Sequence, residues 1–96
     1  MAQKPDTLSL TPLPLEQLPE DKLREINHIL RGYGFRLSDL QLTETKQIGE
    51  LIETHYTGQK GSFAADVTCW TRNGGFVKAF VKVDTYYETV AAQIIA

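Results

Sequence analysis

The sequence of 96 residues is poor in the residue types that most often carry covalent chemistry or bind metals. It has one cysteine, two histidines, one methionine and one tryptophan. A single cysteine cannot close an internal disulfide, which excludes a disulfide scaffold and suits a reducing compartment. The sequence also lacks any Cys-x-x-Cys or His-x-x-x-His pair, so it offers no recognisable start for a zinc site. We therefore expect neither a metal nor a cofactor.

Long apolar runs and an excess of basic charge are missing as well. No stretch approaches the ~18 apolar residues that a membrane-spanning helix needs, and the first residues contain no apolar segment of signal-peptide length. Ten basic and twelve acidic side chains give a formal net charge of −2, which argues against a dedicated nucleic-acid binder. We expect a cytoplasmic protein with no membrane segment.

The prolines are confined to the start of the chain, where all four lie between Pro5 and Pro19 among several leucines. Because proline fixes φ and removes a backbone donor, residues 1–18 are predicted to form an extended arm. Residues 19–96 are then predicted to form a single domain. The arm either lies over its own domain or serves as a detachable strap for a partner or a sister subunit. Its candidate contact residues are Leu8, Leu10, Leu13 and Leu15.

Two segments show apolar residues at helical spacing. The first runs from Pro19 to Arg31, because proline suits the first helical position and acidic residues follow it at the positive end of the helix dipole. Gly32 is expected to end this helix in a left-handed conformation. The second helix is predicted to begin after Thr43 as its N-cap and to end at Gly58. Its apolar stripe consists of Ile48, Leu51 and Ile52, with Tyr56 at the margin.

From Ser62 to Asp84 the apolar residues alternate with polar ones, and Asn73-Gly74 between the two runs is a strong hairpin signal. A loop of Asn73-Gly74-Gly75 pairs apolar residues with apolar residues, whereas a loop of Asn73-Gly74 alone mixes the two faces. The predicted register therefore places Cys69 against Ala79, Val67 against Val81 and Ala65 against Val83. On the other face it places Asp66 across from Lys82 and Trp70 across from Lys78, in reach of a cation–π contact.

Residues 86–95 are compatible with two structures. Their apolar residues recur at helical spacing, which favours a short closing helix, and a further strand is the alternative. The expected fold class is α+β: one small domain with two helices, followed by an antiparallel β-hairpin and a short C-terminal helix or strand. The helices are expected to pack on one face of the small sheet.

The titratable side chains form no catalytic constellation in the sequence. His28 is expected on the solvated side of the first helix, and His55 near the apolar stripe of the second, as a hydrogen-bonded residue at the edge of the core. A ligand or proton-transfer role for His55 is the alternative. Cys69 is predicted to be a small buried residue and Glu53 a solvated one. We therefore predict that the protein is not an enzyme.

The hairpin face opposite the predicted core is the main candidate binding surface. Its predicted residues are Trp70, Phe76, Lys78, Phe80 and Lys82. Aromatic rings flanked by lysines are typical of platforms for single-stranded nucleic acid, but the acidic balance of the chain favours a protein partner. The arm or the C-terminal segment covering this face is a third reading. We predict a small non-catalytic adaptor or regulatory protein that acts through protein–protein contacts, with a partner protein or a second copy of the chain. A weak single-stranded nucleic-acid binder is the alternative.

Overall fold

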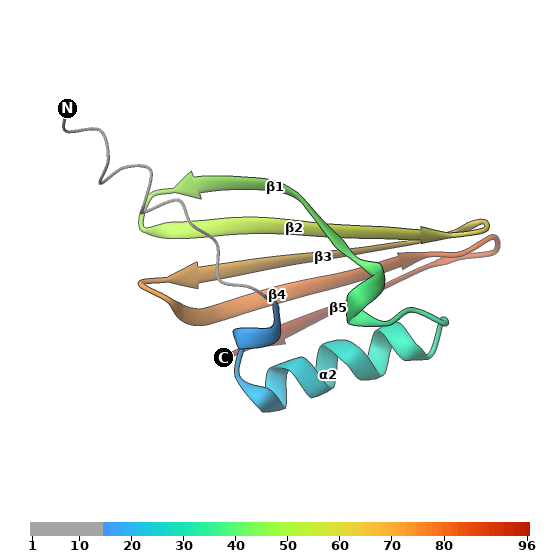
Figure 1. Ribbon diagram of the computed structural model, residues 1–96, viewed down its shortest axis with the longest axis horizontal. Helices are drawn as coiled ribbons and strands as arrows, with labels where there is room; N and C mark the ends of the chain where they lie inside the picture. The colour runs from blue at the N-terminus through green and yellow to red at the C-terminus, as the bar shows by residue number, and fades with distance from the viewer. Residues whose placement is uncertain (1–14) are drawn as a thin grey trace.

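The structure is a five-stranded antiparallel sheet with one α-helix packed on one of its faces (Figure 1). The computed structural model describes residues 15–96, so Leu8, Leu10 and Leu13 of the predicted arm lie outside the described residues. In chain order the elements are η1 (Leu15–Gln17), α2 (Glu20–Arg31), η2 (Leu37–Asp39), β1 (Gln41–Ile48), β2 (Leu51–Lys60), β3 (Phe63–Arg72), β4 (Gly75–Asp84) and β5 (Thr89–Ile95), where η denotes a 3₁₀ helix. The strands follow one another across the sheet as a meander. The predicted fold of two helices with a two-stranded hairpin is therefore wrong.

The first predicted helix is confirmed as α2. Pro19 is its N-cap, and acidic residues occupy its first turn, where they face the positive end of the helix dipole. Ile26 and Leu30 are fully buried against the sheet. The predicted left-handed end at Gly32 is wrong, since Gly32 has a φ of −61°. The left-handed residue is Gly34, with a φ of 85°.

The predicted second helix is wrong, because its residues form the β1–β2 hairpin. The chain reverses after Ile48, at Gly49-Glu50, and Gly49 takes a φ of 62° that glycine adopts without strain. The segment on both sides of this turn is rich in threonine and isoleucine, which favour strands because they are branched at Cβ. Three apolar residues at helical spacing did not outweigh this preference.

The predicted register of the β3–β4 hairpin is confirmed, including the pairs Val67–Val81 and Trp70–Lys78. The predicted loop is wrong: Arg72 pairs with Gly75, so the loop consists of Asn73 and Gly74, both with positive φ. The register is restored by a β-bulge, because Thr71 pairs with Phe76 while Trp70 pairs with Lys78. The bulge turns Phe76 to the helix side, where it packs against the core, and its predicted place beside Trp70 is wrong.

The closing helix predicted for the C-terminal segment is also wrong, and the alternative of a strand is confirmed. β5 pairs along its length with β4, and Ile94 lies opposite Ala79 with 3% of its surface exposed. Pairing with β4 gives half of the β5 backbone groups a partner and places Val90, Ala92 and Ile94 on the helix side of the sheet. A short helix would have left the apolar edge of β4 unpaired.

The core lies between α2 and one face of the sheet. The helix crosses this face diagonally: near its start Lys22 Nζ donates to the carbonyl of Ile95 on β5 (2.6 Å), and beyond its end the carbonyl of Gly34 accepts from Lys60 Nζ on β2 (2.8 Å). The buried apolar residues are Leu15, Leu18, Ile26, Leu30, Phe35, Leu40, Tyr56, Ala65, Val67, Cys69, Ala79, Val81, Val83 and Ile94.

Neither α2 nor either 3₁₀ helix lies over the opposite side of the sheet (Figure 1), which we call the open face. Within residues 15–96, no helix has the length and hydropathy to cross a membrane.

Candidate binding face of the sheet

The open face consists of side chains that alternate with the core residues along each strand. Cross-strand pairing arranges them in rows that run from β1 to β5. One row holds Lys46, Glu53, Trp70, Lys78 and Ile95. The next holds Glu44, His55, Thr68, Phe80 and Gln93, and the third holds Gln41, Thr57, Asp66, Lys82 and Ala91. Acidic, basic, aromatic and neutral polar side chains are therefore interleaved over the whole face.

A chain of hydrogen bonds links β2 and β3 in the middle of this face. Trp70 Nε1 donates to Glu53 Oε1 (2.8 Å), and Glu53 Oε2 lies 2.6 Å from His55 Nε2. His55 Nδ1 lies 3.2 Å from Thr68 Oγ1, and this hydroxyl is also 3.4 Å from Asp66 Oδ1. Because a carboxylate can only accept, a neutral His55 carries its proton on Nε2 and can only accept at Nδ1, so the single hydroxyl proton of Thr68 goes either to His55 Nδ1 or to Asp66 Oδ1. We call Glu53, His55, Asp66, Thr68 and Trp70 the polar network.

Glu53 is the centre of the polar network and is held in its charged form. Its residue is 8% exposed, so the prediction of a solvated side chain is wrong. The hydrogen bond from His55 lowers the pKa of the Glu53 carboxyl, and the bond from Trp70 and the charge of Lys46 act in the same direction. Lys46 Nζ lies 3.7 Å from Glu53 Oε2. The carboxylate therefore positions both Trp70 and His55, because each of its two oxygens forms a hydrogen bond with one of them.

Four of the five residues predicted for the aromatic face do lie together on the open face. The ammonium of Lys78 is 4.8 Å from the centroid of the Trp70 ring, which confirms the predicted cation–π contact. Phe80 stands one row further along with 38% of its surface exposed. Lys82 pairs with Asp66 in the third row, as the register predicts. Of the remaining predicted residues, Phe76 packs on the core side and Leu15 is buried in the core of its own domain.

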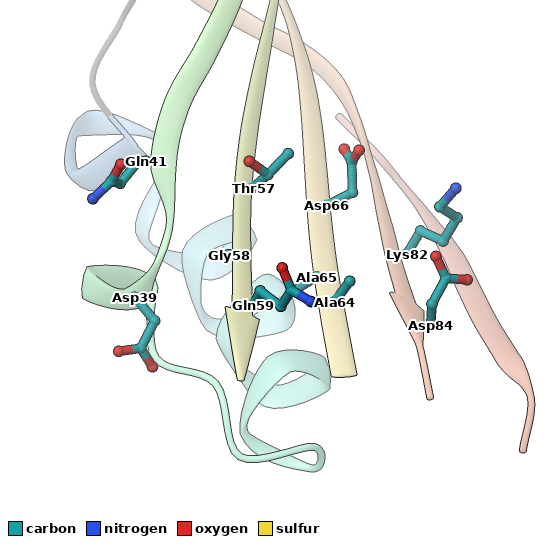
Figure 2. A pocket seen from close by; sticks show the side chains of 10 residues that line it. All are labelled: Asp39, Gln41, Thr57, Gly58, Gln59, Ala64, Ala65, Asp66, Lys82 and Asp84. Atoms are coloured by element: carbon teal, nitrogen blue, oxygen red, sulfur yellow. The ribbon is translucent and has the colours of Figure 1, made fainter. Parts of the chain in front are cut away.

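A polar hollow of about 490 Å³ lies at the end of the open face that is next to the β2–β3 turn. In Figure 2 the side chains of Thr57, Asp66, Lys82 and Asp84 project from neighbouring strands on the same side of the sheet. Asp39 closes one side of it, and the Lys60 ammonium (2.9 Å) together with the Arg36 backbone N–H lowers the pKa of the Asp39 carboxyl. The residues lining the hollow are Asp39, Gln41, Thr57, Gly58, Gln59, Ala64, Ala65, Asp66, Lys82 and Asp84.

The two other residues considered for chemistry lie outside the open face. Cys69 is on the core side with 1% exposure, as predicted, and burial raises the pKa of its thiol to about 12. His28 is exposed on α2, also as predicted. Among residues 15–96, no three His, Cys, Asp or Glu side chains are grouped so that they could hold a metal ion.

The sequence did contain a signal for the missed members of the polar network. From Ile52 to Thr57 the polar residues Glu53, His55 and Thr57 occupy alternate positions, and of the residues between them, Ile52, Thr54 and Tyr56, only Thr54 departs from an alternation of apolar and polar residues. An assignment of this segment as a strand next to β3 would have placed Glu53 and His55 beside Trp70 and Thr68.

No family model, no curated protein and no solved structure matches this chain. The functional conclusion therefore depends on the geometry of the open face.

Proposed function

We propose that this protein is a small non-catalytic cytoplasmic adaptor or regulatory protein that binds a partner protein through the open face of its sheet. The observation that carries the proposal is the placement of Trp70 and Phe80 in adjoining rows of a face that no described helix covers. Phe80 is exposed and Trp70 is half-buried. Tryptophan is enriched among the residues that dominate protein–protein binding, and these residues cluster near the centre of an interface.

The setting of Trp70 supports this reading, because its ring is positioned before any partner arrives. Glu53 holds its indole nitrogen at 2.8 Å, and Lys78 lies over the ring. A contact residue that is already fixed loses less conformational entropy on binding than a mobile one does. A partner that contacts the side of the ring over which Lys78 lies must displace this ammonium group.

The charges of the face favour a protein over a nucleic acid. Lys46, Lys78 and Lys82 are interleaved with Glu44, Glu53, Asp66 and Asp84. A phosphate backbone meets repulsion from such a mixture, whereas a protein surface can offer complementary charges of both signs.

The polar network supports a positioning role better than a catalytic one. The order Thr68, His55, Glu53 matches that of a nucleophile, a base and an orienting carboxylate. Thr68 is only 7% exposed, however, and the polar hollow is lined by Asp66 and not by Thr68 or His55. The geometry gives a substrate little room beside the hydroxyl, so we assign the network to the support of Trp70.

The test compares two exposed apolar residues on opposite faces. Phe80→Ala removes a side chain from the open face, and Leu42→Ala removes one of similar exposure (46% against 38%) from the helix side of β1. Immobilised wild-type and variant proteins are incubated with an extract of the source cells, and the captured proteins are identified by mass spectrometry. We expect one partner that wild type and Leu42→Ala retain and Phe80→Ala loses, while all three proteins give the same far-UV circular dichroism spectrum. Capture that is equal for both variants contradicts the proposal.

Fluorescence separates the protein partner from the nucleic-acid alternative. Trp70 is the only tryptophan of the chain, so its emission reports on the open face alone. The proposal predicts an emission change with the captured partner and none with single-stranded oligonucleotides. Quenching by oligonucleotides that weakens steeply with salt would instead establish the nucleic-acid function.

A further inference from the structure

The two edge strands of the sheet differ in how they are protected against pairing. β1 carries a β-bulge between Leu42 and Glu44, and its exposed side chains include the charged Glu44 and Lys46. Bulges and charges are the usual means by which proteins prevent an edge from pairing with another strand. β5 has the sequence Thr-Val-Ala-Ala-Gln-Ile-Ile, with no charge and no proline, and its register with β4 is continuous. Within residues 15–96, β5 is therefore an unprotected edge.

The outward backbone groups of β5 are available over most of its length. The Ala96 amide donates to the Val77 carbonyl (3.2 Å), so the even-numbered residues of β5 point their backbone groups at β4. Thr89, Ala91, Gln93 and Ile95 therefore point outward. Only Ile95 uses its outward carbonyl within residues 15–96, as the acceptor for Lys22. Within the same residues, no hydrogen bond reaches the outward backbone groups of Thr89, Ala91 and Gln93, and all three residues are exposed.

From this geometry we propose that β5 is the interface at which two copies of this chain pair, antiparallel and about a two-fold axis at Ala91. This register pairs Ala91 with its own copy and Thr89 with Gln93 of the other copy, and it leaves the Lys22–Ile95 bond intact. Open-face side chains of one copy then lie beside open-face side chains of the other, and Val90 of one copy lies opposite Ala92 of the other on the helix side. No like charges come opposite one another, so the strand is complementary to itself.

The protection of β1 determines the size of the assembly. A chain with two unprotected edges would add copies without limit, as fibrils do. A chain with one such edge closes after a single pairing and forms a dimer with a continuous sheet across the axis. The second copy is therefore a better fit to β5 than an unrelated extended peptide, because the same short, uncharged strand supplies both sides. This inference is independent of the partner proposed for the open face.

The test places a charge on the axis. In Ala91→Lys dimers, two lysines would face each other at the position where β5 meets its copy, and in Ala91→Glu dimers two glutamates would do so. Ala91 is exposed but lies opposite Lys82 on β4, so Ala91→Lys also brings two ammonium groups together within one copy. Circular dichroism and a melting curve check that both variants are folded. Gln47→Lys adds the same charge to an exposed position of β1 and is the matched control. The mass of each protein is measured by sedimentation velocity over a series of concentrations.

We expect wild type and Gln47→Lys to reach twice the monomer mass of 10.8 kDa as concentration rises. Each Ala91 variant alone should keep the monomer mass, and an equimolar mixture of the two should recover the doubled mass. A wild-type chain that stays monomeric at every concentration overturns the proposal. Dimers that persist in Ala91→Lys, or a mixture of the two variants that stays monomeric, overturn it as well.

Discussion

Gly58 on β2 offers a direct test of how the chain enters the sheet. It lies on the helix side, opposite Ala65, at the point where η2 and the start of β1 pass over β2. A Cβ atom at this position would meet the backbone oxygen of Asp39 at 2.6 Å and a methyl group of Leu40 at 3.0 Å. We therefore expect Gly58→Ala to destabilise the protein, because the closest atom belongs to the backbone and cannot rotate away.

The expected loss follows from the cost of inserting one methyl group into a packed contact. Such overpacking costs about 1–3 kcal/mol, which for a domain of this size lowers the melting temperature by roughly 4–8 °C per kcal/mol. Relief of the clash displaces Asp39, which weakens its 2.9 Å contact with Lys60, and exposes part of the buried Leu40 side chain. The loss should therefore fall in the upper part of this range.

The assay is thermal unfolding followed by circular dichroism, with Gly32→Ala as the matched control. Gly32 has a right-handed conformation, and a Cβ there would find its nearest neighbour at 3.4 Å, an ordinary contact. Gly32→Ala should keep the melting temperature or raise it slightly, since alanine restricts the unfolded chain. If Gly58→Ala melts together with the wild type, the close approach of η2 to β2 is refuted.

Three further predictions concern the network and the core. For Glu53, whose pKa is lowered from its ordinary 4.5 in the folded protein, the charged form stabilises the fold above that value, and this contribution is lost as pH falls through the folded pKa. The difference in unfolding free energy between wild type and Glu53→Gln, measured in urea at several pH values, should therefore become smaller below pH 4.5. A difference that stays the same at every pH contradicts this prediction. The Cys69 thiol, with its pKa raised to about 12, should react with a thiol reagent only after denaturation, and fast labelling of the native protein would show that β3 is accessible. Phe35→Ala should cost about 3–5 kcal/mol in urea unfolding because the ring is fully buried, whereas Tyr87→Ala, at 89% exposure, should change stability by less than about 0.5 kcal/mol.

The parts of the fold that local sequence determines could be predicted from the sequence. α2 has a proline start, acidic first turn and apolar stripe that agree with one another, and it forms as predicted. The β3–β4 register was predictable because a slip by one residue would exchange buried and exposed faces. The turn itself was not, because a bulge can absorb the extra residue at Val77 and leave the rest of the register unchanged.

The parts that depend on distant neighbours were not predicted. Ile48, Leu51 and Ile52 fit a helical stripe, whereas the β-branched residues around them favour strands, and the pairing of β2 with β3 adds to that preference. The C-terminal segment is a strand because β4 offers it an unpaired edge, which its own sequence does not reveal. The polar network was missed for the same reason, since Glu53 and His55 become neighbours of Trp70 and Thr68 only in the correct sheet.

The contact between Lys22 and Ile95 joins residues that are 73 positions apart, and it has a consequence for the order of folding during synthesis. The meander closes only short loops, so each hairpin can form soon after its second strand emerges. α2 leaves the ribosome before any strand, yet it packs on β4 and β5, the last two strands of the sheet to emerge. The apolar side of α2 therefore stays exposed until β4 and β5 have been synthesised, and a nascent chain cut short before β5 lacks the last strand on which that side packs.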